Sequence, residues 1–80
     1  MQHTPSIKIT LLGPLTEVTS QSVVDLHGDT VEELREDFLR RWPDAMRYQW
    51  KIAVNQSWAI AGQKVSPEDQ IAFLPPFSGG

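Results

Sequence analysis

Residues 28–43 read Gly-Asp-Thr-Val-Glu-Glu-Leu-Arg-Glu-Asp-Phe-Leu-Arg-Arg-Trp-Pro, and this stretch predicts one long helix. Thr30 stands three residues before Glu33, the spacing of a capping box, in which each side chain bonds to the other residue's backbone N–H. Apolar side chains then recur at helical spacing and form one stripe: Val31, Leu34, Phe38 and Trp42, with Leu39 beside them. Pro43 ends the helix, because it cannot donate to the helical hydrogen-bond ladder and disfavours helical geometry at the preceding residue.

Stretches of alternating apolar and polar residues lie on both sides of this helix and predict strands. Before the helix, residues 6–12 alternate, Gly13-Pro14 interrupts the pattern, and a second β-prone stretch covers about residues 17–26. After the helix, we expect strands within residues 48–54, 58–60 and 70–74, separated by turns. The expected order is therefore strand, strand, helix and three strands.

This order predicts an α+β fold, in which a single mixed sheet has one main helix packed across it. It is the β-grasp (ubiquitin-like) arrangement. The 80 residues are enough for one domain, so we expect residues 1–80 to form a single ubiquitin-like domain with a flexible C-terminal tail at residues 75–80.

Composition argues against several classes of protein. There is no cysteine, which excludes disulfides and thiolate metal sites. The net charge is −3 and the seven Lys and Arg residues are scattered, so we expect no nucleic-acid partner. The first residues lack the pattern of a signal peptide, and no stretch has the length of a membrane span. A cytoplasmic protein without membrane contact is the expectation.

The last six residues, Pro-Pro-Phe-Ser-Gly-Gly, form a tail in which we expect the chemistry to lie. Pro75 and Pro76 stop sheet pairing and favour an extended course, and fully extended the tail would reach roughly 20 Å. Gly79 and Gly80 have no side chains, so such an end could enter a narrow tunnel on another protein. A frayed terminus is the alternative explanation of a Gly-Gly ending, but the β-grasp pattern and the Pro-Pro exit favour a working tail.

A terminal carboxylate is ionised at neutral pH and is a poor electrophile, so acyl chemistry at Gly80 requires activation. The sequence has neither a P-loop nor a glycine-rich nucleotide fingerprint. We therefore expect a partner to supply the activating machinery, and any sulfur must also come from outside.

Other candidate sites are weaker. His3 and His27 have no metal-ligand spacing, so no metal site is expected. Ser57 and Ser78 have no accompanying His and Asp that would suggest a hydrolase triad. The three Trp residues are expected in the core, although an exposed one would suggest a partner surface.

Residues 71–80, Ile-Ala-Phe-Leu-Pro-Pro-Phe-Ser-Gly-Gly, closely resemble the C-terminus of the small subunit of molybdopterin synthase, the MoaD type within the MoaD/ThiS sulfur-carrier family. The Pro-Pro-x-Ser-Gly-Gly ending is the most specific part. Residues 53–56 and the beginning and end of the helix resemble this family as well.

The resemblance implies a sulfur carrier that is not an enzyme on its own. A ubiquitin-activating-like adenylyltransferase would use ATP to adenylate Gly80, and a sulfurtransferase system would convert the acyl-adenylate to a thiocarboxylate. The tail would then enter the large subunit of molybdopterin synthase and donate the sulfur to cyclic pyranopterin monophosphate. The carrier binds no cofactor directly, and the resemblance implies a heterotetramer with the large subunit.

The resemblance also assigns roles to residues. Gly80 would carry the acyl-adenylate and the sulfur, and Gly79 would allow passage through a tunnel. Partner contacts would be made by Pro75, Pro76, Phe77 and Ser78. Phe73 would lie near the partner surface, although core packing is equally compatible with its position. Residues 13–17, Gly-Pro-Leu-Thr-Glu, depart from the family because they lack the Arg often found after the first strand.

Two further interpretations stay open. The chain could carry sulfur for thiamin synthesis, cysteine synthesis or tRNA thiolation, although the Pro-Pro ending favours molybdopterin. It could also be a ubiquitin-like binding module with an inert tail.

Overall fold

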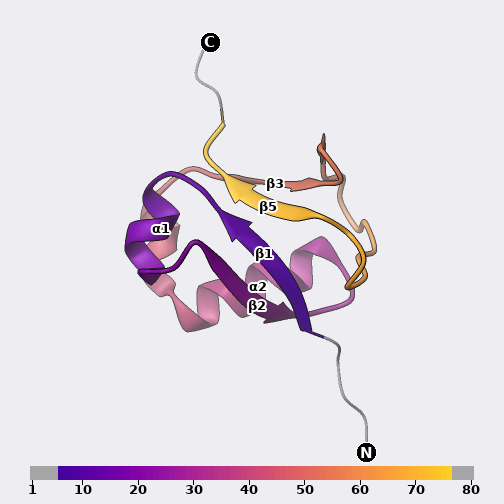
Figure 1. Ribbon diagram of the computed structural model, residues 1–80, viewed down its shortest axis with the longest axis horizontal. Helices are drawn as coiled ribbons and strands as arrows, with labels where there is room; N and C mark the ends of the chain where they lie inside the picture. The colour runs from indigo at the N-terminus through magenta and orange to yellow at the C-terminus, as the bar shows by residue number, and fades with distance from the viewer. Residues whose placement is uncertain (1–5, 77–80) are drawn as a thin grey trace, which may run out of the picture.

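A five-stranded mixed sheet with one main helix across it forms the framework of the protein, as shown by a computed structural model that describes residues 6–76 (Figure 1). The strands lie in the order β2-β1-β5-β3-β4; β1 and β5 run parallel, and the other neighbours are antiparallel. The elements in chain order are β1 (Ser6–Leu11), α1 (Pro14–Thr19), β2 (Val23–His27), α2 (Val31–Arg41), the 3-10 helix η1 (Pro43–Arg47), β3 (Lys51–Val54), β4 (Ser57–Trp58) and β5 (Ile71–Leu74). The predicted α+β architecture is confirmed.

The predicted main helix is present as α2, and its first turn differs from the expected capping box in one bond. Thr30 Oγ1 accepts a hydrogen bond from the N–H of Glu33 at 3.2 Å, as predicted. Glu33 Oε1, however, accepts from the N–H of Asp29 at 2.6 Å rather than from that of Thr30. The reason is the close approach of the preceding loop: a Cβ on Gly28 would lie only 2.8 Å from the Cβ of Glu33.

The segment before β2 corrects the sequence prediction. Residues 17–19, expected at the start of a strand, belong to the short helix α1. Pro14 occupies the first turn of this helix, where a missing N–H costs no hydrogen bond, so Gly13-Pro14 is a helix start as well as a strand end. Thr19 Oγ1 accepts from the N–H of Gln21, and Ser20 adopts a left-handed conformation that ends the helix. The sequence also gave no prediction of the 3-10 helix η1 at residues 43–47.

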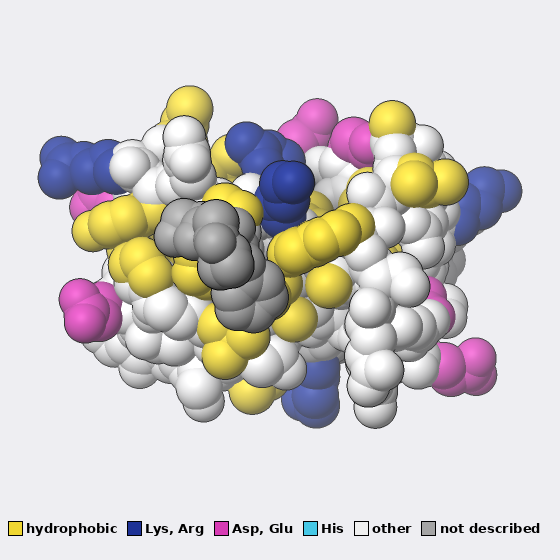
Figure 2. Space-filling model, turned by 90° about the horizontal axis from the view of Figure 1, so that it is seen from above, with side chains coloured by type: hydrophobic (Ala, Val, Ile, Leu, Met, Phe, Trp, Pro, Cys, Tyr) yellow, Lys and Arg dark blue, Asp and Glu magenta, His cyan; other side chains and the backbone are white. Residues whose placement is uncertain are grey.

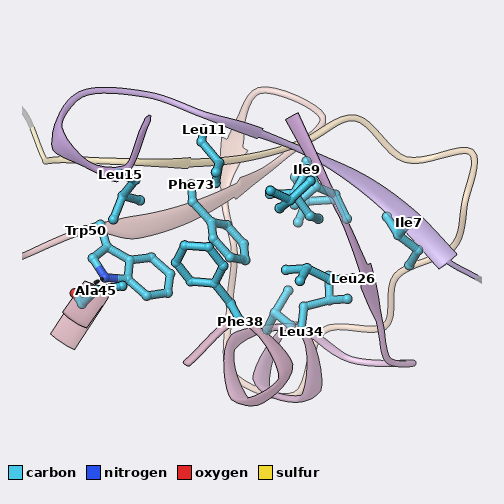
Figure 3. Packing of buried hydrophobic residues seen from close by; sticks show 14 residues of the cluster. Ile7, Ile9, Leu11, Leu15, Leu26, Leu34, Phe38, Ala45, Trp50 and Phe73 are labelled. Atoms are coloured by element: carbon cyan, nitrogen blue, oxygen red, sulfur yellow. Dashed lines mark hydrogen bonds between the residues drawn. The ribbon is translucent and has the colours of Figure 1, made fainter. Parts of the chain in front are cut away.

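The core lies between α2 and the sheet and is centred on three aromatic rings (Figure 3). Phe38 of α2 packs edge-on against Phe73 of β5 and Trp50, with ring centroids 5.1 and 5.4 Å apart. Trp50 stacks on Phe73 at 4.8 Å, and its indole N–H donates to the carbonyl of Ala45 at 3.0 Å. The predicted core faces are confirmed for β1, whose buried residues Ile7, Ile9 and Leu11 alternate with exposed ones.

Two backbone groups at the outer edge of β2 are hydrogen-bonded by side chains of α2. The buried carboxylate of Asp37 accepts a hydrogen bond from the N–H of His27 at 2.9 Å and pairs with Arg40 and Arg41. Arg41 also donates to the carbonyl of Asp25 at 2.7 Å. Because these groups belong to an edge strand, the bonds from α2 occupy backbone sites that could otherwise pair with another chain.

Candidate functional site

The position at which the chain leaves the sheet is fixed by two contacts at the end of β5. The N–H of Leu12 donates to the carbonyl of Phe73 at 3.1 Å. Pro75 then packs against Gly13, whose φ is +64°, so closely that a Cβ on Gly13 would lie 3.0 Å from Pro75 Cγ. The half-buried Pro75 therefore leaves the sheet over a residue with no side chain.

The structure places only some of the predicted site residues. Phe73 is fully buried in the aromatic core, so of its two interpretations core packing is the one observed, and its side chain has no surface to offer a partner. Pro75 and Pro76 are half-buried and directly follow β5. Phe77, Ser78, Gly79 and Gly80 lie outside the described residues. The predicted partner-contacting segment is thus described only at its base.

Beside this base, the sheet face opposite α2 carries a groove. The strand registers place one residue of each strand in a row across this face: Val23, Thr10, Ala72, Ala53 and Trp58. The three central side chains are small, so the face is hollowed to a volume of about 960 Å³. We call this hollow the sheet-face groove; it is lined by Lys8, Thr10, Ala53, Gln56, Ser57, Trp58, Asp69, Gln70, Ile71, Ala72 and Leu74.

The sheet-face groove is continuous with the base of the tail, because Leu74 lines the groove and directly precedes Pro75. Trp58 stands at its other side with 46 % of its surface exposed. Seen from above the end of β5, apolar side chains gather on this part of the molecule, with Lys and Arg side chains between them (Figure 2). A partner that takes up the tail can therefore also contact an adjoining, partly apolar surface.

Asp69 lines the polar end of the sheet-face groove and accepts hydrogen bonds that order the loops there. Its carboxylate accepts hydrogen bonds from the side-chain amide of Asn55 at 3.0 Å and from the N–H of Ser66 at 2.8 Å. These bonds favour the charged form, the Asn55 bond most, and lower the pKa of Asp69 below its ordinary value of 3.8. Asn55 Oδ1 accepts in turn from the N–H of Gln70 at 2.9 Å, so the turn after β3 is tied to the loop before β5.

Sequence reasoning missed two parts of this site. Gly13 was identified only as a strand breaker, and nothing local indicates that Pro75 packs on it. The sheet-face groove was missed because its row of small residues is assembled from strands far apart in the chain. The one available signal was the expectation that an exposed Trp would suggest a partner surface, and Trp58 is that residue.

Two negative observations apply to residues 6–76. In this part of the chain, no helix has both the length and the apolar character needed to cross a membrane. The same residues contain no group of three or more His, Asp or Glu side chains that could hold a metal ion.

The mixed sheet, the single crossing helix and the chain that leaves the end of β5 define a ubiquitin-like β-grasp protein. The ThiS family model matches residues 9–80, and the chain belongs to this family of ubiquitin-like sulfur carriers. The predicted MoaD/ThiS resemblance is thereby confirmed.

Solved structures of similar fold belong to differently named proteins. A small archaeal modifier protein 1 from H. volcanii has a TM-score of 0.77 at 20% identity, covering 90% of this chain and 98% of that one. A putative molybdopterin converting factor subunit 1 from Pyrococcus furiosus has a TM-score of 0.80 at 15% identity, with the same coverages of 90% and 98%. A complex of subunits 1 and 2 of the molybdopterin-converting factor from Helicobacter pylori contains a chain with a TM-score of 0.60 at 21% identity, covering 95% and 100%.

Proposed function

We propose that this chain is the sulfur-carrying subunit of a molybdopterin synthase, and that the carboxylate of Gly80 is its working group. The observation that carries the proposal is the match to the ThiS family through residue 80, which includes the Pro-Pro-x-Ser-Gly-Gly ending. The likeness to a putative molybdopterin converting factor subunit supports this recipient in particular.

The chemistry would proceed in two activating steps and one transfer. A carboxylate oxygen of Gly80 attacks the α-phosphorus of ATP, and pyrophosphate leaves. A sulfide equivalent from a sulfurtransferase then attacks the acyl carbon, and AMP leaves with the original oxygen. The product is a thiocarboxylate, which differs from the starting chain by one sulfur in place of one oxygen. The thiocarboxylate sulfur is finally transferred to cyclic pyranopterin monophosphate, and water attacks the acyl carbon, which restores the carboxylate of Gly80.

The chain's own contribution is to present the tail, while partners supply the catalysis. The contact between Pro75 and Gly13 sets where the tail begins, and the sheet-face groove offers an adjoining surface for docking. We propose that the large synthase subunit and a ubiquitin-activating-like adenylyltransferase contact this end of the molecule in turn. The Helicobacter pylori complex of subunits 1 and 2 supports the first of these partners, and a heterotetramer is the assembly we propose with it.

The experiment that tests the proposal measures intact mass after incubation with an adenylyltransferase, ATP and a sulfur donor. The expected gain equals the difference between a sulfur and an oxygen atom, and it should vanish when Gly80 is deleted. The loaded chain is then given to a large synthase subunit with cyclic pyranopterin monophosphate, and molybdopterin should form.

The two stages separate the alternatives. Loading without molybdopterin formation would move the proposal to another recipient, such as the thiamin, cysteine or tRNA pathways. No loading, by an adenylyltransferase that is active on another carrier, would favour a binding module with an inert tail. The likeness to the H. volcanii modifier supports a second candidate function, covalent modification of other proteins. In that case, covalent adducts between this chain and other proteins should form after activation.

A further inference from the structure

A second groove lies on the helix side of the sheet edge, between α2 and strands β3 and β4. Its volume is about 380 Å³. We call it the edge groove; the residues that matter here are Glu32, Arg35, Trp50, Lys51, Trp58 and Ile60. Trp58 lines both this groove and the sheet-face groove, so its ring is the ridge between them.

Two positive charges are held at the wall of the edge groove by aromatic rings. The guanidinium carbon of Arg35 lies 4.8 Å from the ring centroid of Trp50, and Lys51 Nζ lies 5.4 Å from that of Trp58. A cation over an aromatic face keeps its full charge, so these contacts position the cations without neutralising them.

These two cations also lack carboxylate partners within residues 6–76. In this part of the chain, Lys8, Arg40, Arg41 and Arg47 each form an ion pair with an Asp, whereas Arg35, Lys51 and Lys64 form none, and Lys64 lies outside the groove. The lining of the groove thus carries two cations and one carboxylate, in a chain whose net charge is −3.

The rest of the edge groove is largely apolar. Ile60 is 71 % exposed and Trp58 46 %, so two large apolar side chains of one groove are open to solvent. The acidic residue in the lining, Glu32, directs Oε2 to the N–H of Gly62 at 2.8 Å and so helps to hold the loop after β4. The groove therefore combines exposed apolar side chains with two fixed cations.

We propose that the edge groove binds a short acidic segment of a partner protein, in which apolar side chains alternate with carboxylates. The carboxylates pair with Arg35 and Lys51, and the apolar side chains pack on Ile60 and Trp58. The charge complementarity selects an acidic segment over a basic one. The proposal does not depend on the sulfur chemistry of the tail.

The test is a titration of the ¹⁵N-labelled protein, followed by ¹H–¹⁵N correlation spectra, with the end-blocked peptide Glu-Leu-Asp-Leu-Glu. The expected shifts involve the indole N–H groups of Trp50 and Trp58 and the amides of Lys51 and Ile60. The counterpart Lys-Leu-Lys-Leu-Lys should cause none of them. Arg35→Glu should weaken binding by about tenfold, because repulsion replaces an exposed ion pair.

Arg47→Glu is the matched control, since Arg47 is an exposed cation outside the groove. The same spectra show whether each variant is folded. Equal binding of both peptides, shifts confined to the sheet-face groove, or equal weakening by Arg35→Glu and Arg47→Glu would each overturn the proposal. Shifts that appear on concentrating the protein without peptide would identify a second copy as the occupant and would also overturn it.

Discussion

Replacing Gly13 by Ala tests whether the exit of the tail is set by the fold. Gly13 has φ +64° and ψ −144°, a conformation that is essentially restricted to glycine, so the substitution should cost about 1–3 kcal/mol. The new methyl group would also lie 3.0 Å from Pro75 Cγ and would displace the proline ring. A domain of this size has a stability of about 4–12 kcal/mol, so the variant should remain folded.

Thermal unfolding and sulfur loading measure the two effects separately. At about 4–8 °C per kcal/mol for a domain of this length, the expected fall in Tm is roughly 4–24 °C. Loading, followed by intact mass well below the Tm, should also be slower, because the tail leaves the sheet from a displaced Pro75. In the double variant Gly13→Ala/Pro75→Ala, the proline ring that the new methyl group displaces is gone, so loading should be as fast as in Pro75→Ala alone. The backbone strain at residue 13 and the lowered Tm should remain.

Gly62→Ala is the matched control for strain without displacement. Gly62 also has a positive φ, +77°, but nothing lies within 4 Å of the position its Cβ would take. This variant should lose stability and load at the normal rate. If Gly13→Ala loads as fast as Gly62→Ala, the contact between Gly13 and Pro75 does not direct the tail. If Gly13→Ala leaves the Tm unchanged, the argument from backbone strain is wrong.

Three further predictions concern the parts of the fold that hold the site. Phe38→Ala should lower the free energy of unfolding by about 3–5 kcal/mol, because it opens a cavity among the core rings; a loss in urea unfolding no larger than that of Phe38→Leu would contradict this. Asp37→Ala should cost about 1–3 kcal/mol, since it removes the buried acceptor at the β2 edge, whereas Asp44→Ala, at an exposed pair, should stay within about 0.5 kcal/mol in the same assay. The lowered pKa of Asp69 means that its stabilising contribution is complete above the ordinary value of 3.8 and is lost as the pH falls through the folded pKa. The side-chain amide resonances of Asn55 should therefore shift in that acid range, and an unchanged titration in Asp69→Asn would contradict this assignment.

The parts of the fold that the sequence predicted are those set by local periodicity. The alternation of β1 and the apolar stripe of α2 each identify a buried face within a few residues, and the structure confirms both. Helix α1 was missed because it has only six residues, too few to show a helical period, and because the Gly13-Pro14 pair that starts it is also a strand breaker. Glu33 accepts from the N–H of Asp29 and not from that of Thr30. The capping-box pattern could not predict this, because the path of the preceding loop depends on tertiary packing.

For the candidate site as well, the sequence predicted the local part and missed the part that depends on tertiary structure. The tail was recognisable because its residues are consecutive, and the family match extends through them. The sheet-face groove depends instead on registers that bring Ala72 beside Ala53 and Thr10, which no local pattern specifies. Phe73 shows the limit of a positional argument, because a residue next to the tail proved to be in the middle of the core.

The parallel pairing of β1 with β5 has a consequence for how the molecule is made. These neighbouring strands in the middle of the sheet come from opposite ends of the sequence, so their contacts span most of the chain. During synthesis, β1 lacks its neighbour β5 until residues 71–74 have left the ribosome. Pairing between strands so far apart in the sequence is also intrinsically slow. Phe73 arrives with the same strand and completes the aromatic core. A chain truncated before β5 therefore cannot place Pro75 against Gly13, and it would not present this geometry to a partner.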